Sequence, residues 1–270
     1  MRTDFARAAA RYDQAAVLAQ EVGRRMAQRL DYVRIAPFRV ADIGCATGDG
    51  IRELIRRYPQ AYPLAVDYAL PMLQTLRPRD GLWRRLRGRS ARALNADVRA
   101  LPLAAGSLSL VWSNLMLHWL DDPLPAFREL HRVLEVDGLL TFSLFGPDTL
   151  KELRRACAAC GIDSPQRGFA DMHDIGDMLV AAGFADPVMD METITLTYAK
   201  ANGLLRDQRL LGVRNGLFGA LRWRQWRQVF AAWERVEDRL PASFEIVYGH
   251  TWKPRPRTVA DGRAVINFQR

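Results

Sequence analysis

The sequence predicts an α/β fold, with one seven-stranded, mostly parallel sheet and helices on both of its faces. Three observations predict it: strand-like and helical segments alternate, a glycine-rich turn joins the first strand to a helix, and acidic residues stand at three successive strand ends. Parallel neighbours need a crossover connection, usually a helix, so this alternation is typical of a doubly wound sheet. The 270 residues, 49% hydrophobic and 26% charged, have the size and composition of an ordinary soluble domain.

The first strand ends in a glycine-rich turn that opens a helix expected at 51–58. Gly44 and Gly48 can adopt backbone angles closed to other residues and let a ligand approach the main chain, next to the free N–H groups of a helix start. The turn lacks the Gly-x-Gly-x-x-Gly spacing of dinucleotide enzymes. Its pattern, Asp42-x-Gly44-x-x-x-Gly48, resembles the first motif of the class I methyltransferases, which have a Rossmann-like fold and use S-adenosylmethionine. The alternative is a purely structural glycine turn.

That resemblance implies a cofactor site along the first strands. The loop contributes Asp42, Gly44, Cys45 and Gly48, with Cys45 at a position where a small residue suffices. The second strand, 62–67, ends in Asp67, 19 positions after Gly48, where an acid reaches ribose hydroxyls. Further cofactor contacts are expected from Tyr68 beside it, from Asp97 and Val98 at the adenine after the third strand (91–97), and from Asn114 beside the transferred methyl. A lone Asp at a strand end otherwise reads as a cap or turn residue.

The later elements continue the alternation. A helix at 124–134 is expected to stop at Glu135 to Gly138, where glycine permits a left-handed residue. The other expected elements are strands at 107–114, 138–146, 187–198 and 244–252 and helices at 148–160 and 172–182.

We expect a single domain over 1–270, organised in four parts. They are an N-terminal helical cap (1–36, with its helix at 5–30), a cofactor-binding core (37–199), a helical insertion (200–241), and the final strand and tail (242–270). Cap and insertion together are expected to form a lid that excludes water and positions the acceptor, because selectivity in a widely used fold resides in such additions.

The net charge of +9 and the pI near 10.0 favour an acidic partner through long-range steering. A bias in codon composition would also explain the excess of arginine. Nucleic acid is not favoured, because no nucleic-acid module is present and Trp223 and Trp226 have the helical spacing typical of a core. Arginine is concentrated in two places, the first at Arg84, Arg85, Arg87 and Arg89 and the second at Arg206, Arg209, Arg214, Arg222, Arg224 and Arg227.

The chain has neither a run of apolar residues long enough to span a bilayer nor a signal-peptide core after its first residues. We therefore expect a cytoplasmic protein without a membrane partner. Three cysteines do not make a disulfide framework in a chain of this length. Cys157 and Cys160 have redox or metal spacing, but they lie in a helical pattern with no second Cys or His pair nearby, which favours packing and no metal site.

Five segments give a narrower resemblance. They are FARAAARYD (5–13), SNLMLHW (113–119), LFGPDTLKELR (144–154), LRDQRLLG (205–212) and PASFEIVYGH (241–250). Together they resemble the malonyl-carrier-protein O-methyltransferases of biotin synthesis over nearly the whole chain. The resemblance implies that S-adenosylmethionine methylates the free carboxyl of a malonyl thioester, carried by an acidic acyl carrier protein or by coenzyme A, so that fatty-acid synthesis can elongate it towards a pimeloyl ester.

The proposed chemistry needs alignment and no general base, because a carboxylic acid with a pKa near ~4 is already ionised at neutral pH. Arg206 and Arg209 are candidates for binding the carboxylate or the thioester arm, since a guanidinium binds carboxylates bidentately; the alternative is a solvated helix face. Tyr12 is expected to close over the sulfonium or to donate its hydroxyl to the acceptor. His118 follows the fourth strand, where the acceptor lies in this fold, and is not expected to act as a base.

Two other functions remain open from the sequence. Some of the same segments resemble the mitochondrial complex I assembly factors of methyltransferase-like fold, which are assigned to arginine hydroxylation. Hydroxylation ordinarily requires a redox metal, and no His-x-Asp facial triad is evident. The third possibility is a scaffold that keeps the fold without the activity, against which the intact Asp42, Gly44, Gly48 and Asp67 argue.

Overall fold

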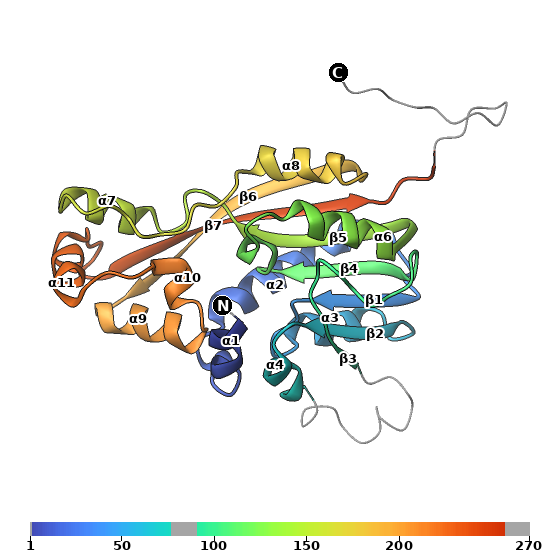
Figure 1. Cartoon of the computed structure of the whole chain (residues 1–270), viewed down its shortest axis with the longest axis horizontal. Coiled ribbons are helices and arrows are strands. Elements are labelled where there is room, and N and C mark those ends of the chain that lie inside the picture. The colour runs from blue at the N-terminus through green and yellow to red at the C-terminus, as the bar shows by residue number, and fades with distance from the viewer. Residues whose placement is uncertain (1, 77–90, 257–270) are drawn as a thin grey trace.

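The computed structural model describes residues 2–76 and 91–256 and contains one seven-stranded sheet in the order β3-β2-β1-β4-β5-β7-β6 (Figure 1). Neighbouring strands from β3 to β5 are parallel, and β7 runs antiparallel to both β5 and β6. The predicted seven-stranded, mostly parallel sheet is therefore confirmed. The strands are β1 (Arg39–Ile43), β2 (Tyr62–Asp67), β3 (Arg92–Asn95), β4 (Leu108–Asn114), β5 (Leu134–Phe145), β6 (Ala185–Tyr198) and β7 (Leu240–Trp252).

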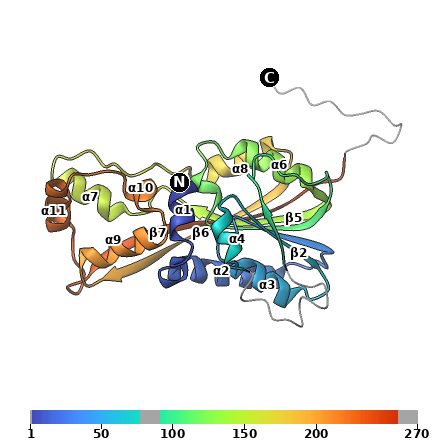
Figure 2. The same ribbon diagram turned by 60° about the horizontal axis from the view of Figure 1, so that its bottom comes forward.

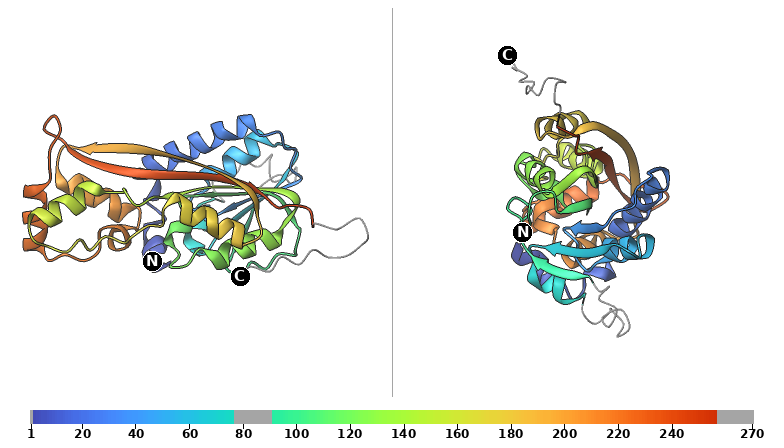
Figure 3. Two further views of the ribbon diagram at one scale, coloured as in Figure 1. Left: turned by 90° about the horizontal axis from the view of Figure 1, so that it is seen from above. Right: turned by 90° about the vertical axis from the view of Figure 1, so that its right-hand side faces the viewer.

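Helices cover both faces of the parallel part of the sheet (Figures 2 and 3). On one face, α2 (Val17–Arg29) and α3 (Asp49–Arg57) bury Val22, Met26 and Leu54 against the strands, with Trp112 of β4 in the same cluster. On the other face lie α6 (Leu124–Val133) and α8 (Met172–Ala181). Because both faces are covered, the central strand β4 is buried along nearly its whole length, as expected for a parallel sheet.

The N-terminal segment is not one helix, as the sequence predicted, but a series of short ones. It forms α1 (Arg2–Ala8), η1 (Tyr12–Gln14), α2 and η2 (Leu30–Tyr32). The breaks carry α1 across to α4 (Leu70–Gln74), with which it packs. The turn at Gly212 lies against the same segment, where a Cβ atom would stand 2.7 Å from the carbonyl oxygen of Asp4. The N-terminal cap and the segment between β6 and β7 thus touch.

That segment carries α9 (Ala201–Leu210), α10 (Arg214–Phe218) and α11 (Trp223–Ala232). Figure 1 shows them gathered with α7 (Lys151–Ala159) at one end of the molecule, beside the far ends of β6 and β7. Trp226 is buried and stacks on Phe230, as predicted for a core residue. Trp223 is 68% exposed, so its assignment to the core is wrong.

Several predicted boundaries shift. Strand β5 already begins at Leu134, directly after α6, so the helix does not end at a glycine. The residue with left-handed backbone angles in this segment is Asp137 (φ 61°). Gly138 is needed for close packing instead, because a Cβ there would stand 2.8 Å from the carbonyl oxygen of Glu135. Strand β7 begins at Leu240, before the predicted end of the insertion. The first arginine cluster, from Arg84 to Arg89, and the tail beyond residue 256 lie outside the described residues.

All three cysteines are free thiols, with Cys157 buried in α7. Among the described residues, no His, Cys, Asp and Glu side chains are grouped closely enough to hold a metal ion. Nor does any helix in that part of the chain have the length and apolar character needed to cross a membrane.

Candidate active site

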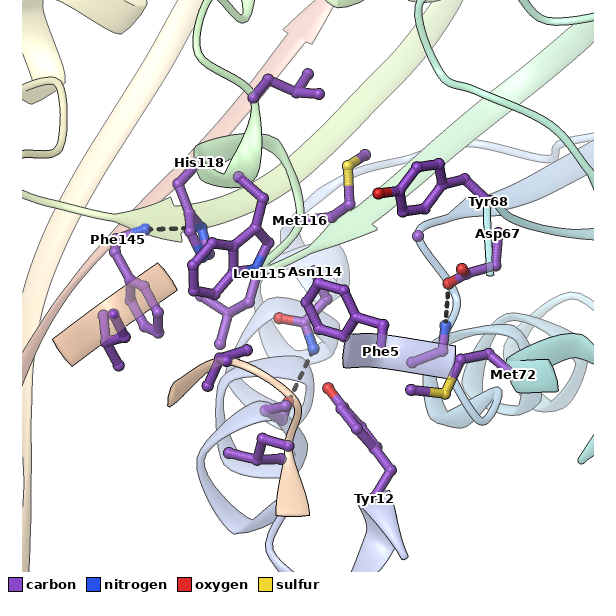
Figure 4. A pocket seen from close by; sticks show the side chains of 18 of the residues that line it. Phe5, Tyr12, Asp67, Tyr68, Met72, Asn114, Leu115, Met116, His118 and Phe145 are labelled. Carbon is purple, nitrogen blue, oxygen red and sulfur yellow. Dashed lines mark hydrogen bonds between the residues drawn. The ribbon is translucent and has the colours of Figure 1, made fainter. Parts of the chain in front are cut away.

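A cavity of about 380 Å³ opens at the carboxyl ends of β1, β2 and β4, the edge at which doubly wound sheets bind ligands. Figure 4 shows Asp67 and Tyr68 at one end, His118 and Phe145 at the other, and Phe5, Tyr12 and Asn114 between them. Of the residues predicted from the sequence, the cavity is lined by Tyr12, Gly44, Asp67, Tyr68, Asp97, Val98, Asn114 and His118.

The glycine loop forms the wall nearest β1. Gly44 has φ +79° and lines the cavity, and a Cβ there would come within 2.3 Å of the Met116 side chain. Gly48 has φ +91° and begins α3 without lining the cavity. Cys45 is buried behind the loop, where burial raises the pKa of its thiol and keeps it protonated. Gly44 thus brings the main chain to the cavity, while Gly48 and Cys45 shape the loop.

Asp42 lies beneath this loop and does not line the cavity. It accepts a hydrogen bond from the backbone N–H of Ile51 in the first turn of α3, while its Oδ2 is buried without a partner. Burial raises the pKa of Asp42 to about 8, with the Ile51 bond opposing the shift. The side chain therefore fixes the start of α3, and its contact with the cofactor stays a prediction.

Asparagine in place of Asp42 is expected to alter how stability depends on pH. The pKa of this acid is near ~4 in the unfolded chain and higher in the folded protein. Between these two pKa values the unfolded chain releases the proton and the folded protein keeps it, so the free energy of unfolding falls as the pH rises. Between roughly pH 5 and pH 8, the free energy of unfolding of the unaltered protein should therefore fall relative to Asp42→Asn by up to about 1.4 kcal/mol per pH unit. Urea titrations of both proteins at several pH values measure this difference, with exposed Asp177→Asn as control. Parallel pH profiles for Asp42→Asn and the unaltered protein would contradict the assignment.

Asp67 is held from two sides, by the glycine loop after β1 and by the turn after its own strand. Its Oδ2 accepts the N–H of Ala46 at 2.9 Å (Figure 4). Its Oδ1 accepts the N–H of Ala69 at 2.7 Å. Burial raises the pKa of the carboxyl, and the backbone N–H groups of Ala69, Ala46 and Tyr68 counteract that shift. These donors hold the carboxylate in place, and the lone pairs that they leave free suit a neighbouring pair of hydroxyls. Tyr68 lies next to it and carries the Arg2 guanidinium 5.5 Å from its ring centre.

Asp97 stands two residues beyond β3 and closes a tight turn. Its Oδ1 accepts the backbone N–H of Arg99 at 2.9 Å, and its Oδ2 pairs with the Arg99 guanidinium at 2.6 Å. The hydrogen bond from that side chain lowers the pKa of Asp97. Asp97 is thus both a turn residue and part of the cavity wall, and its contact with an adenine stays a prediction.

The N-terminal cap is bonded to the rest of the site at two points. Asn114 donates from Nδ2 to the carbonyl oxygen of Ala19 in α2 at 2.8 Å, and its Oδ1 accepts the Ser143 hydroxyl at 2.8 Å. The hydroxyl of Thr47, in the glycine loop, donates to the Oδ1 of Asp13 at 2.5 Å, and Asp13 is the residue that follows Tyr12 in the chain. Asn114 therefore holds α2 to the sheet. Burial raises the pKa of Tyr12, so its hydroxyl stays protonated where it meets the cavity.

His118 closes the other end of the cavity from η4 (Leu117–Trp119). Its Nδ1 accepts the backbone N–H of Phe145 at 3.3 Å, and its Nε2 is buried without a partner. Burial lowers the pKa of His118 well below its usual range, with the charge of Arg167 adding to the shift. The ring is neutral, and because Nδ1 is an acceptor, the proton is on Nε2. His118 is a hydrogen-bond donor without a partner.

The structure does not bring Arg206 and Arg209 into the cavity. Both are exposed, and the residues of α9 that line the cavity are Asp207 and Gln208, with Leu211 directly after the helix. The sequence reading missed Gln208 and also Arg167, which lines the cavity from the segment between α7 and α8. The burial of Leu204 and Gln208, four residues apart, marks the inward face of α9, a helical periodicity that was available in the sequence.

The residues present fit S-adenosylmethionine. Gly44 admits a ligand to the main chain, Asp67 offers a held carboxylate to ribose hydroxyls, and the faces between them are apolar, including Ile43, Val66 and Met72. The volume is within the range of small-molecule sites. Fold and site together define a class I methyltransferase with S-adenosylmethionine as its cofactor.

Comparison with known proteins agrees with that class and narrows it. Residues 41–142 match a family model described as a methyltransferase domain. Two solved structures resemble the chain in fold, each at 15% identity: the YcgJ protein from Bacillus subtilis (TM-score 0.59, covering 87% of this chain and 99% of that one) and a putative methyltransferase from Bacillus halodurans (0.60, 85% and 97%).

Two curated relatives carry the same name. A malonyl-[acyl-carrier protein] O-methyltransferase of Gallionella capsiferriformans is 50% identical over 98% of this chain and 94% of its own. A protein of the same name from Laribacter hongkongensis is 49% identical over 99% of this chain and 94% of its own. The chain belongs to the malonyl-[acyl-carrier protein] O-methyltransferase family.

Proposed function

We propose that the protein transfers the methyl group of S-adenosylmethionine to the free carboxyl of a malonyl group on acyl carrier protein, giving the methyl ester that starts pimeloyl formation in biotin biosynthesis. The observation that carries the proposal is the continuation of the cavity beyond the cofactor end. Past Asn114 it is lined by aromatic rings and by hydrogen-bonding groups, including Trp119, His118 and Gln208. Such a chamber suits a small acyl group.

Bound S-adenosylmethionine supplies an electrophilic methyl group on a sulfonium. A malonyl carboxylate oxygen forms the new O–C bond with its own lone pair, the C–S bond breaks, and its electron pair stays on sulfur. No proton is removed, so no residue acts as a base. The protein's part is to hold the oxygen in line and about 3 Å from the methyl carbon, which contributes several kcal/mol through orientation.

The aromatic residues at the middle of the cavity serve that alignment. The Tyr12 ring attracts a cation through its face, and its protonated hydroxyl is a donor for the acceptor. Phe5 packs edge-on against Trp119 with ring centres 6.0 Å apart, so α1 and η4 meet over the chamber. We infer that the cap and the segment between β6 and β7 form the lid, because Phe5 and Tyr12 line the cavity from one and Gln208 and Leu217 from the other.

An acidic carrier protein fits the outward face of that lid. Arg206, Arg209, Arg224 and Arg227 are exposed on α9 and α11, and none of the four forms a salt bridge within the described part of the chain. The only acid from 200 to 228 is Asp207, which hydrogen-bonds Tyr198 and lines the cavity. This basic surface also carries the exposed Trp223. It favours docking of an acidic partner near the cavity through complementary charge.

We also propose the cytoplasm as the place of the reaction, since free thiols are typical of a reducing compartment.

Complementation tests the proposal in cells. The chain is expected to restore biotin-independent growth to a bacterial strain that lacks its own malonyl-carrier-protein methyltransferase, and Asp67→Ala is expected not to. Growth failure with the unaltered chain, while a known family member expressed to the same level succeeds, would refute the proposed substrate.

A further inference from the structure

The acceptor end of the cavity holds a positive charge that methyl transfer itself does not require. Two described cavity-lining residues are cationic, Arg99 and Arg167, and Arg99 is engaged by Asp97 near the cofactor end. Arg167 comes from the segment between α7 and α8, with a side chain 27% exposed. A cation beside an apolar chamber is unfavourable unless an anion compensates it.

Only one nitrogen of the Arg167 guanidinium, Nη2, has partners among the described residues. Its Nη2 donates to the carbonyl oxygen of Leu120 at 2.6 Å and pairs with Oδ1 of Asp121 at 2.9 Å. The Asp121 side chain is 99% exposed, so water screens this ion pair. Within residues 2–76 and 91–256, Nε and Nη1 of Arg167 have no hydrogen-bond partner. Two directions of the planar fork are therefore available to a ligand.

Two buried polar groups without partners line the same chamber. His118 is 6% exposed and presents Nε2–H, and Gln208, on α9, is 3% exposed with an unpaired Oε1. The charge of Arg167 acts on the His118 ring, so the two side chains are neighbours. Leaving such buried groups unpaired costs more than an ordinary hydrogen bond returns, which points to a polar ligand that satisfies them.

We propose that Arg167 selects an acyl group with a free carboxylate by donating to one of its oxygens, while the Nε2–H of His118 donates to the thioester carbonyl. The proposal rests on the function proposed above and deepens it. Because Arg167 binds only one oxygen of the carboxylate, the second oxygen is left to attack the methyl carbon. Asp121 shares the guanidinium and limits its pull on the negative charge. An acetyl group lacks the carboxylate, and in a succinyl group an extra methylene displaces it, so both lose this contact.

Substituting Arg167 with glutamine tests the assignment with the full-length protein. With malonyl carrier protein, Arg167→Gln is expected to raise KM about tenfold to a hundredfold, the loss typical of a hydrogen bond to a charged group. Acetyl carrier protein, added as a competitive inhibitor, should keep its inhibition constant, and S-adenosylmethionine its calorimetric affinity. Arg167→Lys, which keeps a cation without the fork, should recover part of the loss.

Two further variants separate substrate binding from a structural role. Asp121→Asn removes the same ion pair but leaves the guanidinium in place without its competing anion, so its KM should fall below the unaltered value, the opposite of Arg167→Gln. Arg255→Gln, at the distant exposed pair with Asp137, is the matched arginine control. An unchanged KM in Arg167→Gln, an equal loss of acetyl inhibition, or the same defect in Asp121→Asn would overturn the inference. Absence of any transfer by the unaltered protein would instead overturn the proposed function.

Discussion

Alanine in place of Asp67 is expected to weaken S-adenosylmethionine binding by roughly fivefold to 150-fold, corresponding to about 1 to 3 kcal/mol. The carboxylate is held by the N–H groups of Ala46 and Ala69, so it would bind the ribose hydroxyls without reorganising. Alanine removes the acceptors and leaves those two backbone donors unpaired in a buried place. Titration calorimetry with S-adenosylmethionine measures the effect directly.

The matched control is Asp177→Ala on α8, an exposed acid that does not line the cavity. Its affinity for the cofactor should equal that of the unaltered protein. Far-ultraviolet circular dichroism of Asp67→Ala checks that the sheet is intact. If Asp67→Ala folds and binds the cofactor with unchanged affinity, the ribose end of the site is elsewhere.

The second large effect concerns the carrier protein. Changing Arg206, Arg209, Arg224 and Arg227 together to glutamate is expected to lower kcat/KM for malonyl carrier protein about tenfold to a thousandfold at low ionic strength, the range of electrostatic steering. Transfer to a malonyl thioester too small to span the surface, such as malonyl-pantetheine, should change little, since the four residues lie outside the cavity. Added salt should narrow the difference between the variant and the unaltered protein.

A second quadruple variant controls for net charge. Arg34, Arg39, Arg92 and Arg128 are exposed outside α9 and α11, and changing them to glutamate lowers the net charge by the same amount. If overall charge alone governs the encounter, both variants will lose rate equally. If α9 and α11 form the docking surface, only the first variant will lose rate. Equal rates for the first variant and the unaltered protein would place the carrier elsewhere.

The cofactor half of the molecule was readable from the sequence because its signals are local. Strand β2 was predicted at its observed bounds, since its apolar run ends in an acid at a fixed distance from the glycine loop. Gly44 and Asp67 line the cavity as neighbours in the sheet register, with Ile43 opposite Val66. Sequence spacing alone did not distinguish residues that line the cavity from residues that support the loop. Asp42 and Gly48 shape the loop from behind it.

The acceptor half depends on how distant segments meet, and there the sequence was less informative. Arginine chemistry singled out Arg206 and Arg209, but α9 turns about 100° per residue, and its packing directs Asp207 and Gln208 inward instead. Arg167 lies in a segment without helical or strand periodicity, so nothing local ties it to His118, 49 positions earlier. The exposure of Trp223 has the same origin, since helical spacing places it on α11 but does not say which face is covered.

The central claim is methyl transfer to a malonyl carboxylate, and mass spectrometry of the product tests it most directly. Purified protein is incubated with isotope-labelled S-adenosylmethionine and malonyl carrier protein or malonyl-coenzyme A, with acetyl and succinyl thioesters as controls. We expect a labelled methyl ester on the malonyl species, formed faster on the carrier protein, and none on the acetyl thioester. Measurable cofactor binding without label on any malonyl thioester would contradict the proposed function and favour a protein-modifying or scaffold role.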